Sequence, residues 1–146
     1  MSINRDALFS SKTAEWETPQ EFFQALDSEF HFTLDACATS KNAKCKSFFT
    51  ASDNGLSQEW TGTVWCNPPY GKEIGKWCEK AYKTAQAGKA TVVMLLPART
   101  DTRWFHEWVY HKGEIRFVRG RLKFGGAPYN APFPSMVVIY RRNDNL

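Results

Sequence analysis

The turn Asn67-Pro68-Pro69-Tyr70 follows directly on the apolar segment 63–66 and strongly limits how this chain can fold. Because proline has no N–H group, two successive prolines end the hydrogen-bond ladder of a sheet. The apolar segment is therefore predicted to be a strand that ends at Cys66, and a loop is predicted to begin at Asn67. The chain has 146 residues, which is enough for one compact domain with its own core.

Helices and strands are predicted to alternate along the sequence. A helix of about ten residues should begin at Pro19 with Thr18 as its N-cap, a second should span 73–87 and end at Gly88, and a third should start at Asp101. The alternation is typical of an α/β three-layer sandwich with a mostly parallel sheet. Strands are predicted at 32–34, 47–49, 63–66, 91–96, 114–118 and 136–140.

The chemistry of the Asn67-Pro68-Pro69-Tyr70 turn suits a planar amine. In open α/β sheets ligands bind beyond the carboxyl ends of the strands, which here are followed by 35–38, 50–54, 67–71 and 97–100. The Asn67 side-chain oxygen and the Pro68 carbonyl can accept both hydrogens of one amino group, while Tyr70 stacks on the ring that bears it. Two acceptors localise the lone pair of an exocyclic amine, so no general base is needed if the proton leaves late. The alternative is a plain loop with Tyr70 in the core.

Seven short blocks of sequence stand in a recognisable order, at 16–20, 34–38, 53–60, 64–70, 95–100, 120–124 and 133–135. Through these blocks the chain resembles the bacteriophage-type (Dam-like) DNA N6-adenine methyltransferases over nearly its whole length. The resemblance implies a Rossmann-like methyltransferase fold, S-adenosylmethionine as methyl donor, and transfer to adenine N6 in double-stranded DNA by base flipping. It implies catalytic roles for Asn67, Pro68, Pro69 and Tyr70.

The resemblance also implies a donor site. The backbone around Thr18 would receive the methionine carboxylate, and Asp35 would bond the methionine ammonium in a loop that lacks the family's usual glycines. Asp53 stands where an acid would contact the donor's adenine, with an exposed Asx-turn as the alternative. No acid for the ribose hydroxyls is found after the second strand. The implied donor-binding residues are Trp16, Thr18, Pro19, Asp35, Ala36, Cys37, Asp53 and Asn67.

Basic residues follow the fourth predicted strand and lie in and after the fifth. A net charge of +4 permits nucleic acid as a partner without requiring it. Arg121 and Lys123 should share one face of an extended segment while Leu122 packs inward. Cations of this kind contact phosphates, and an interleaved ring can fill the stack that a flipped base leaves; the alternative is a solvated face over core aromatics. The predicted DNA contacts are Arg99, Arg103, Arg119, Arg121 and Lys123, with Arg116 beside them and Phe124, Tyr129 and Phe133 interleaved.

Other classes of function fit less well. The four cysteines and three histidines show no metal-ligand spacing, and no membrane span or signal peptide is recognised, so a cytoplasmic protein without metal is expected, in the host cell if a phage encodes it. The rivals are transfer to adenine in RNA, transfer to a protein glutamine amide, and a non-catalytic nucleic-acid-binding relative. Transfer to a glutamine amide would not need the basic loop. A non-catalytic relative would account for the missing glycines after Leu34.

Length bears on how DNA sequence could be read. Residues 1–146 are expected to form a single methyltransferase domain, with 1–14 as a flexible segment and no separate target-recognition domain. Relaxed sequence specificity or a homodimer is therefore predicted.

Overall fold

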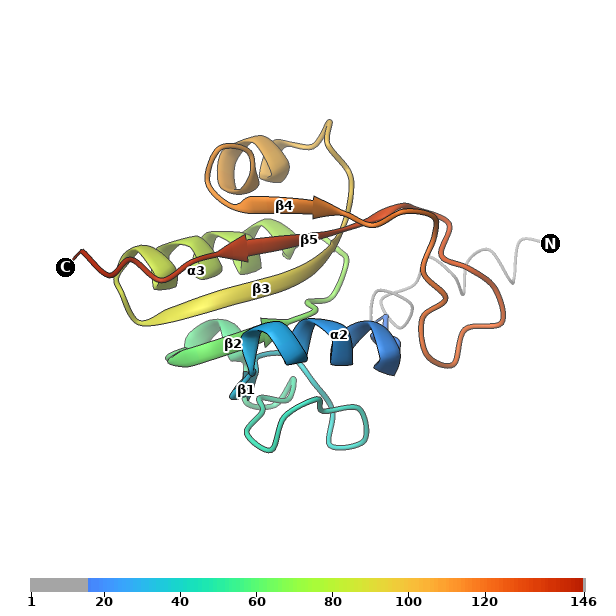
Figure 1. The fold of residues 1–146 in the computed structure, drawn as a ribbon, viewed down its shortest axis with the longest axis horizontal. Coiled ribbons are helices and arrows are strands. Elements are labelled where there is room, and N and C mark those ends of the chain that lie inside the picture. Colours follow the sequence, from blue (N-terminus) through green and yellow to red (C-terminus); the bar gives the residue numbers. More distant parts are fainter. Residues whose placement is uncertain (1–15, 146) are drawn as a thin grey trace.

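The computed structural model describes residues 16–145, and the predicted flexible segment 1–14 lies outside this range. Its sheet has five strands in the order β1-β2-β3-β5-β4 (Figure 1). The first three pair in parallel, and β5 runs antiparallel to both of its neighbours. The protein is thus a small α/β structure with a mixed sheet that is parallel at its start. The strands are β1 (Leu34–Asp35), β2 (Gly62–Cys66), β3 (Ala90–Pro97), β4 (Glu114–Phe117) and β5 (Ser135–Tyr140).

Two helices, α2 (Gln20–Phe30) and α3 (Ile74–Gln86), cover opposite faces of the sheet (Figure 1). Phe23 of α2 packs against Trp65, with ring centroids 5.3 Å apart. Tyr82 of α3 packs against Tyr140, at 6.2 Å. Trp65 is in register with Val93 and Tyr140 with Val92, so the two rings point to opposite faces. No helix within residues 16–145 is long and apolar enough to cross a membrane.

The start of α2 differs from the sequence prediction. Pro19, not Thr18, is the residue before the helix; it is extended (ψ 134°), and its carbonyl accepts from the N–H of Phe23. No side chain caps this end, because the Thr18 hydroxyl accepts a hydrogen bond from Asn67 instead. The predicted cap is therefore wrong, although the helix has 11 residues, close to the predicted length of about ten.

A predicted strand and a second predicted helix cap are also wrong. Residues 47–49 form no strand; they touch the sheet through one parallel bridge between Asp35 and Phe48. The predicted helix with Trp104, Phe105, Trp108 and Val109 is present as a short helical segment at 103–109, which ends in the π-helix η3 (Phe105–Val109). Its capping residue was predicted one position too early, because the hydroxyl of Thr102, and not Asp101, accepts from the N–H of Phe105. Short segments of this kind depend on tertiary contacts more than on local propensity. A 3₁₀ turn, η2 (Gly55–Ser57), precedes β2.

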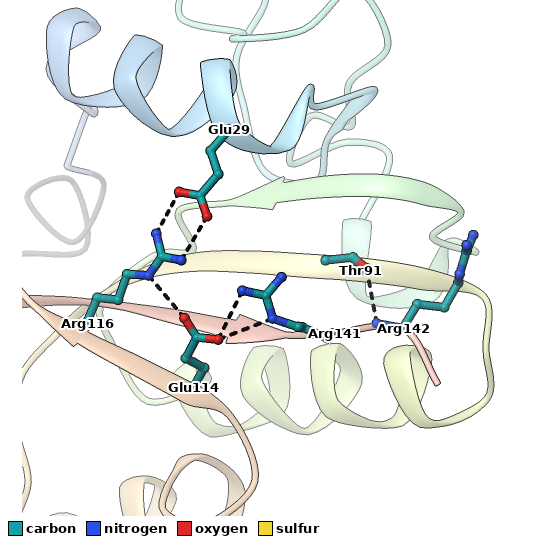
Figure 2. A network of polar contacts seen from close by, with 6 residues as sticks. All are labelled: Glu29, Thr91, Glu114, Arg116, Arg141 and Arg142. Carbon is teal, nitrogen blue, oxygen red and sulfur yellow. Dashed lines mark hydrogen bonds and ion pairs between the residues drawn. The ribbon is translucent and has the colours of Figure 1, made fainter. Parts of the chain in front are cut away.

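An ion-pair network ties α2 to the β4 edge of the sheet (Figure 2). Arg116 of β4 donates to both carboxylate oxygens of Glu29 at 2.7 and 2.8 Å and to Glu114 at 3.1 Å. Arg141 donates to Glu114 at 3.0 Å. Arg116 was expected beside the basic DNA-contacting residues, but two carboxylates neutralise it. This correction follows from the fold, which brings Glu29 to a residue 87 positions later.

Candidate active site

The turn after β2 is fixed by a hydrogen bond that replaces a missing strand contact. β2 and β3 pair as far as Cys66 and Met94, and Pro68 and Pro69, which follow Asn67, have no N–H to donate. The hydroxyl of Tyr70 instead donates to the carbonyl of Leu95 at 2.9 Å. The turn that the two prolines predict is therefore present, and Tyr70 anchors it to the neighbouring strand.

Asn67 is oriented by the segment that precedes α2. Its side-chain nitrogen donates to the carbonyl of Trp16 and to the Thr18 hydroxyl, the latter at 3.0 Å. A carbonyl can only accept, so the nitrogen must face this segment and the amide oxygen must face away. That oxygen, Oδ1, is buried and has no hydrogen-bond partner among the described residues. Buried acceptors are normally paired, so the unsatisfied oxygen of Asn67 is an exception that needs an explanation.

Asp35, at the end of β1, is a carboxylate with 2% exposure. It accepts from the backbone N–H groups of Cys37 at 3.2 Å and Lys44 at 3.0 Å. Burial raises its pKa to about 6, against the lowering effect of these two hydrogen bonds. A buried carboxylate with a raised pKa is suited to bind a cationic group, which would replace the water it has lost.

A cavity of about 380 Å³ joins these groups at the carboxyl end of β1 and β2. It unites the residues after the first three predicted strands, whereas 97–100 does not line it. Its volume lies in the range of small-molecule sites. The lining consists of Trp16, Glu17, Thr18, Asp35, Cys37, Ala38, Thr39, Ser40, Asn42, Lys44, Thr50, Ala51, Ser52, Trp65, Asn67 and Pro69.

Most of the predicted donor-binding residues meet in this cavity, but three do not line it. Ala36 is fully buried, and Pro19 stands beside the wall. Asp53 accepts from the N–H and hydroxyl of Thr50 at 2.8 and 3.0 Å, so its carboxylate closes a turn instead of facing the cavity. The wall formed by 39–44 was not predicted, because this irregular loop carries no periodicity or motif.

Tyr70 belongs to an aromatic cluster. Its ring is buried and lies edge-on to Phe124 at 6.4 Å and to Phe133 at 5.6 Å. Trp16 contacts the same two rings at 5.4 and 5.3 Å. The backbone N–H of Gly125 donates to the Glu17 carbonyl at 2.8 Å, which clamps the loop between β4 and β5 to the segment before α2. We call these four rings, Trp16, Tyr70, Phe124 and Phe133, the aromatic cluster.

The predicted basic residues fall into two groups. Arg119, Arg121 and Lys123 are exposed on the loop between β4 and β5, and Leu122 is half-buried between the last two, as the alternation predicted. Arg103 is exposed but paired with Glu107, and Arg99 lies over the ring of Phe133 at 5.7 Å. Within residues 16–145 there is no cluster of His, Cys, Asp and Glu that could hold a metal ion.

Comparison with known proteins identifies the family. Residues 7–143 match the family model described as DNA N-6-adenine-methyltransferase (Dam). A protein of Haemophilus phage HP1 named DNA N-6-adenine-methyltransferase is 35% identical over 106 residues, which is 70% of this chain and 61% of that protein. A protein of the same name from Escherichia phage T1 is 32% identical over 110 residues, 73% of this chain and 45% of its own length.

A third relative, named putative methyltransferase YfdM, from Escherichia coli K12, is 36% identical over 64 residues, 38% of this chain and 70% of that protein. This chain therefore spans less than two thirds of the length of either phage relative. The family model covers most of the chain, including the turn at Asn67, Asp35 and the loop between β4 and β5. The chain belongs to the DNA N-6-adenine-methyltransferase (Dam) family.

Proposed function

We propose that this protein transfers a methyl group from S-adenosylmethionine to the N6 amine of adenine in DNA, on a Rossmann-like methyltransferase fold that receives the base flipped out of the duplex. Family membership and the names of the phage relatives support the reaction class. The observation that carries the proposal is the buried, unpartnered Oδ1 of Asn67 at the edge of the cavity. An acceptor at this point is what an amine nucleophile requires.

The cavity fits a methyl donor with a cationic amine. Bound S-adenosylmethionine would supply an activated methyl group on a sulfonium centre. Asp35 would hold its ammonium, since a buried carboxylate is strongly stabilised by a cation. The segment from Trp16 to Pro19 would bind the carboxylate of the donor, and Ala36 and Cys37 would form the wall beside it. Asp53 would act through the turn at 50–54, whose residues Thr50 to Ser52 line the cavity.

The acceptor base would bind next to the donor. Asn67 Oδ1 and the Pro68 carbonyl would take the two amine hydrogens, with Pro69 fixing the turn and Tyr70 stacking on the purine. The ring of Tyr70 is now covered by Phe124 and Phe133. The loop that carries these two rings must therefore shift before a base can stack.

The loop between β4 and β5 would hold the duplex. Arg119, Arg121 and Lys123 are exposed there, and Tyr129 is 80% exposed close to them in sequence. Of the three interleaved rings, Phe124 and Phe133 are buried. Tyr129 is therefore the residue that we assign to the gap left by the flipped base. Arg99 and Arg103 would extend the phosphate contacts on the neighbouring edge.

Some expectations stay predictions. These are the single methyltransferase domain over 1–146, the homodimer, and the cytoplasmic location. Duplex DNA as the partner follows from the proposed reaction.

Transfer of a labelled methyl group tests this function. The full chain is incubated with labelled S-adenosylmethionine and unmethylated duplex DNA, with RNA and a glutamine peptide as parallel acceptors, and the products are analysed as nucleosides or amino acids. We expect label in N6-methyladenine from DNA. Label only in 5-methylcytosine, in RNA, in glutamine, or nowhere would contradict the proposal. Asn67→Ala should abolish transfer while donor binding by calorimetry persists. The control Asn143→Ala, far along the chain, should keep both transfer and donor binding.

A further inference from the structure

One cation in the wall of the cavity has no part in the reaction proposed above. Among the described residues that line the cavity, Lys44 is the only lysine, arginine or histidine. Its ammonium donates to the side-chain oxygen of Gln20 at 2.8 Å and lies over the ring of Phe23, 5.9 Å from the ring centroid. The ion pairs found within residues 16–145 do not include Lys44. The wall therefore carries a half-buried positive charge that no carboxylate of the described chain neutralises.

Lys44 is joined to Asp35 through its backbone and not through its charge. The backbone N–H of Lys44 donates to the Asp35 carboxylate at 3.0 Å, whereas its ammonium bonds to Gln20, the first residue of α2. Burial raises the pKa of Asp35 more than the two backbone hydrogen bonds and the charge of Lys44 lower it. Two opposite charges thus line one cavity without forming an ion pair, and each would be stabilised by a ligand group of the opposite sign.

A ligand that carries both charges would satisfy the two residues together. The amino-acid end of S-adenosylmethionine has its ammonium and its carboxylate on the same carbon atom. If Asp35 holds the ammonium, the carboxylate must lie close by. Residues 16–19, which would bind this carboxylate, include no cation, and Glu17 among them lines the cavity with a negative charge. The positive charge that a bound carboxylate needs must therefore come from another part of the wall.

We propose that the ammonium of Lys44 binds the carboxylate of S-adenosylmethionine, next to the segment 16–19. This inference rests on the proposed function and adds the residue that recognises the negative charge of the donor. An ammonium has three N–H donors, so Lys44 can keep its hydrogen bond to Gln20 while it binds the ligand. Because Lys44 is not paired with Asp35, the donor can enter between the two charges without first breaking an ion pair.

Donors with and without a carboxylate test this contact. Calorimetry measures binding of S-adenosylmethionine and of decarboxylated S-adenosylmethionine, which keeps the ammonium and the sulfonium, to the full chain. Lys44→Met removes the charge but keeps the backbone N–H that bonds to Asp35. In this variant we expect the affinity for S-adenosylmethionine to fall about tenfold and the affinity for the decarboxylated donor to stay at the wild-type value.

Two further variants serve as controls. Lys41→Met makes the same change of charge on an exposed residue of the same loop that does not line the cavity, so both affinities should equal those of the wild type. Lys44→Arg keeps a cation and should restore most of the affinity for S-adenosylmethionine. Equal losses for both donors in Lys44→Met, or no loss for S-adenosylmethionine, would overturn the inference, as would a Lys44→Arg variant that binds no better than Lys44→Met.

The reciprocal ligand assigns the two charges to their residues. The 2-oxo acid analogue of the donor keeps the carboxylate and lacks the ammonium. Lys44→Met should weaken its binding about tenfold, whereas Asp35→Asn should leave its binding unchanged. The opposite pattern would show that Lys44 does not recognise the carboxylate.

The wild type by itself separates this inference from the proposed function. Equal affinities of the wild type for S-adenosylmethionine and its decarboxylated form would overturn the carboxylate contact, even if methyl transfer to DNA takes place. Tight binding of S-adenosylmethionine without any transfer to DNA would instead refute the proposed reaction and leave the Lys44 contact supported by the binding data.

Discussion

The side-chain nitrogen of Asn67 donates to the hydroxyl of Thr18 at 3.0 Å, although 49 residues separate them in the chain. Together with the Trp16 carbonyl, this contact turns the amide oxygen of Asn67 away from the N-terminal segment. The residues before α2 thus set the direction of the acceptor that follows β2. A substitution at Thr18 should consequently affect the proposed amine acceptor site, although Thr18 itself does not form that site.

Thr18→Val should lower kcat for methyl transfer about tenfold, because the valine keeps the shape but not the acceptor for the Asn67 amide. Thr18→Ser keeps the hydroxyl and should keep most of the activity. Steady-state kinetics on DNA measures the effect. Equal losses in both variants would mean that packing, not the hydrogen bond, is what matters at this position.

Tyr70→Phe should destabilise the protein by about 1–3 kcal/mol, because the buried Leu95 carbonyl loses its donor. Tyr82→Phe is the matched control, since the Tyr82 hydroxyl only accepts from the exposed Gln86 side chain. Urea unfolding of both variants gives the difference. A Tyr70 variant as stable as the control would show that the hydroxyl is not needed to hold the turn.

Donor affinity should depend on pH through Asp35. Burial raises its pKa to about 6, and only the charged form attracts an ammonium. Calorimetry should therefore show affinity falling about tenfold per pH unit below pH 6 and staying level above it. Asp35→Asn should bind the donor weakly at every pH. A wild-type affinity that is flat from pH 5 to 7 would refute the ammonium contact.

The same carboxylate should affect stability with the opposite trend in pH. The folded state holds the proton of Asp35 up to about pH 6, while the unfolded state releases it near 3.8. Raising the pH through this interval therefore lowers the contribution of Asp35 to stability, by up to about 3 kcal/mol. Unfolding free energies of the wild type should fall relative to those of Asp35→Asn between pH 4 and 6. Parallel curves would contradict this.

Arg121→Ala and Arg116→Ala should behave differently although both remove one arginine. Arg121 is exposed on the loop, so its loss should weaken DNA binding and reduce the salt slope of log K by about 1. Arg116 is neutralised by Glu29 and Glu114, so its loss should leave the slope unchanged and cost about 1 kcal/mol of stability. Binding titrations at several salt concentrations separate the two. Equal salt slopes for the two variants would show that Arg121 does not contact DNA.

Local sequence determined much of the fold. The paired prolines ended β2 at Cys66, helical spacing located α3 to within one residue at each end, and the apolar run at 91–96 gave the core of β3. Arg121, Leu122 and Lys123 alternate as the spacing indicated. These features depend on backbone donors and side-chain periodicity within a few residues, which a sequence displays directly.

Only the tertiary structure decided which groups meet. The sequence indicated an acceptor at Asn67 and a carboxylate at Asp35, but not the 39–44 wall or the use of Thr18 to orient Asn67 instead of capping α2. It also could not show that Glu29 neutralises Arg116. A polar side chain can pair only with groups that folding brings near it. In this protein the packing of α2 on the sheet brings those groups together. Residue types thus determined which polar groups this protein has, and the long-range contacts of its fold determined which of those groups are left without a hydrogen-bond partner.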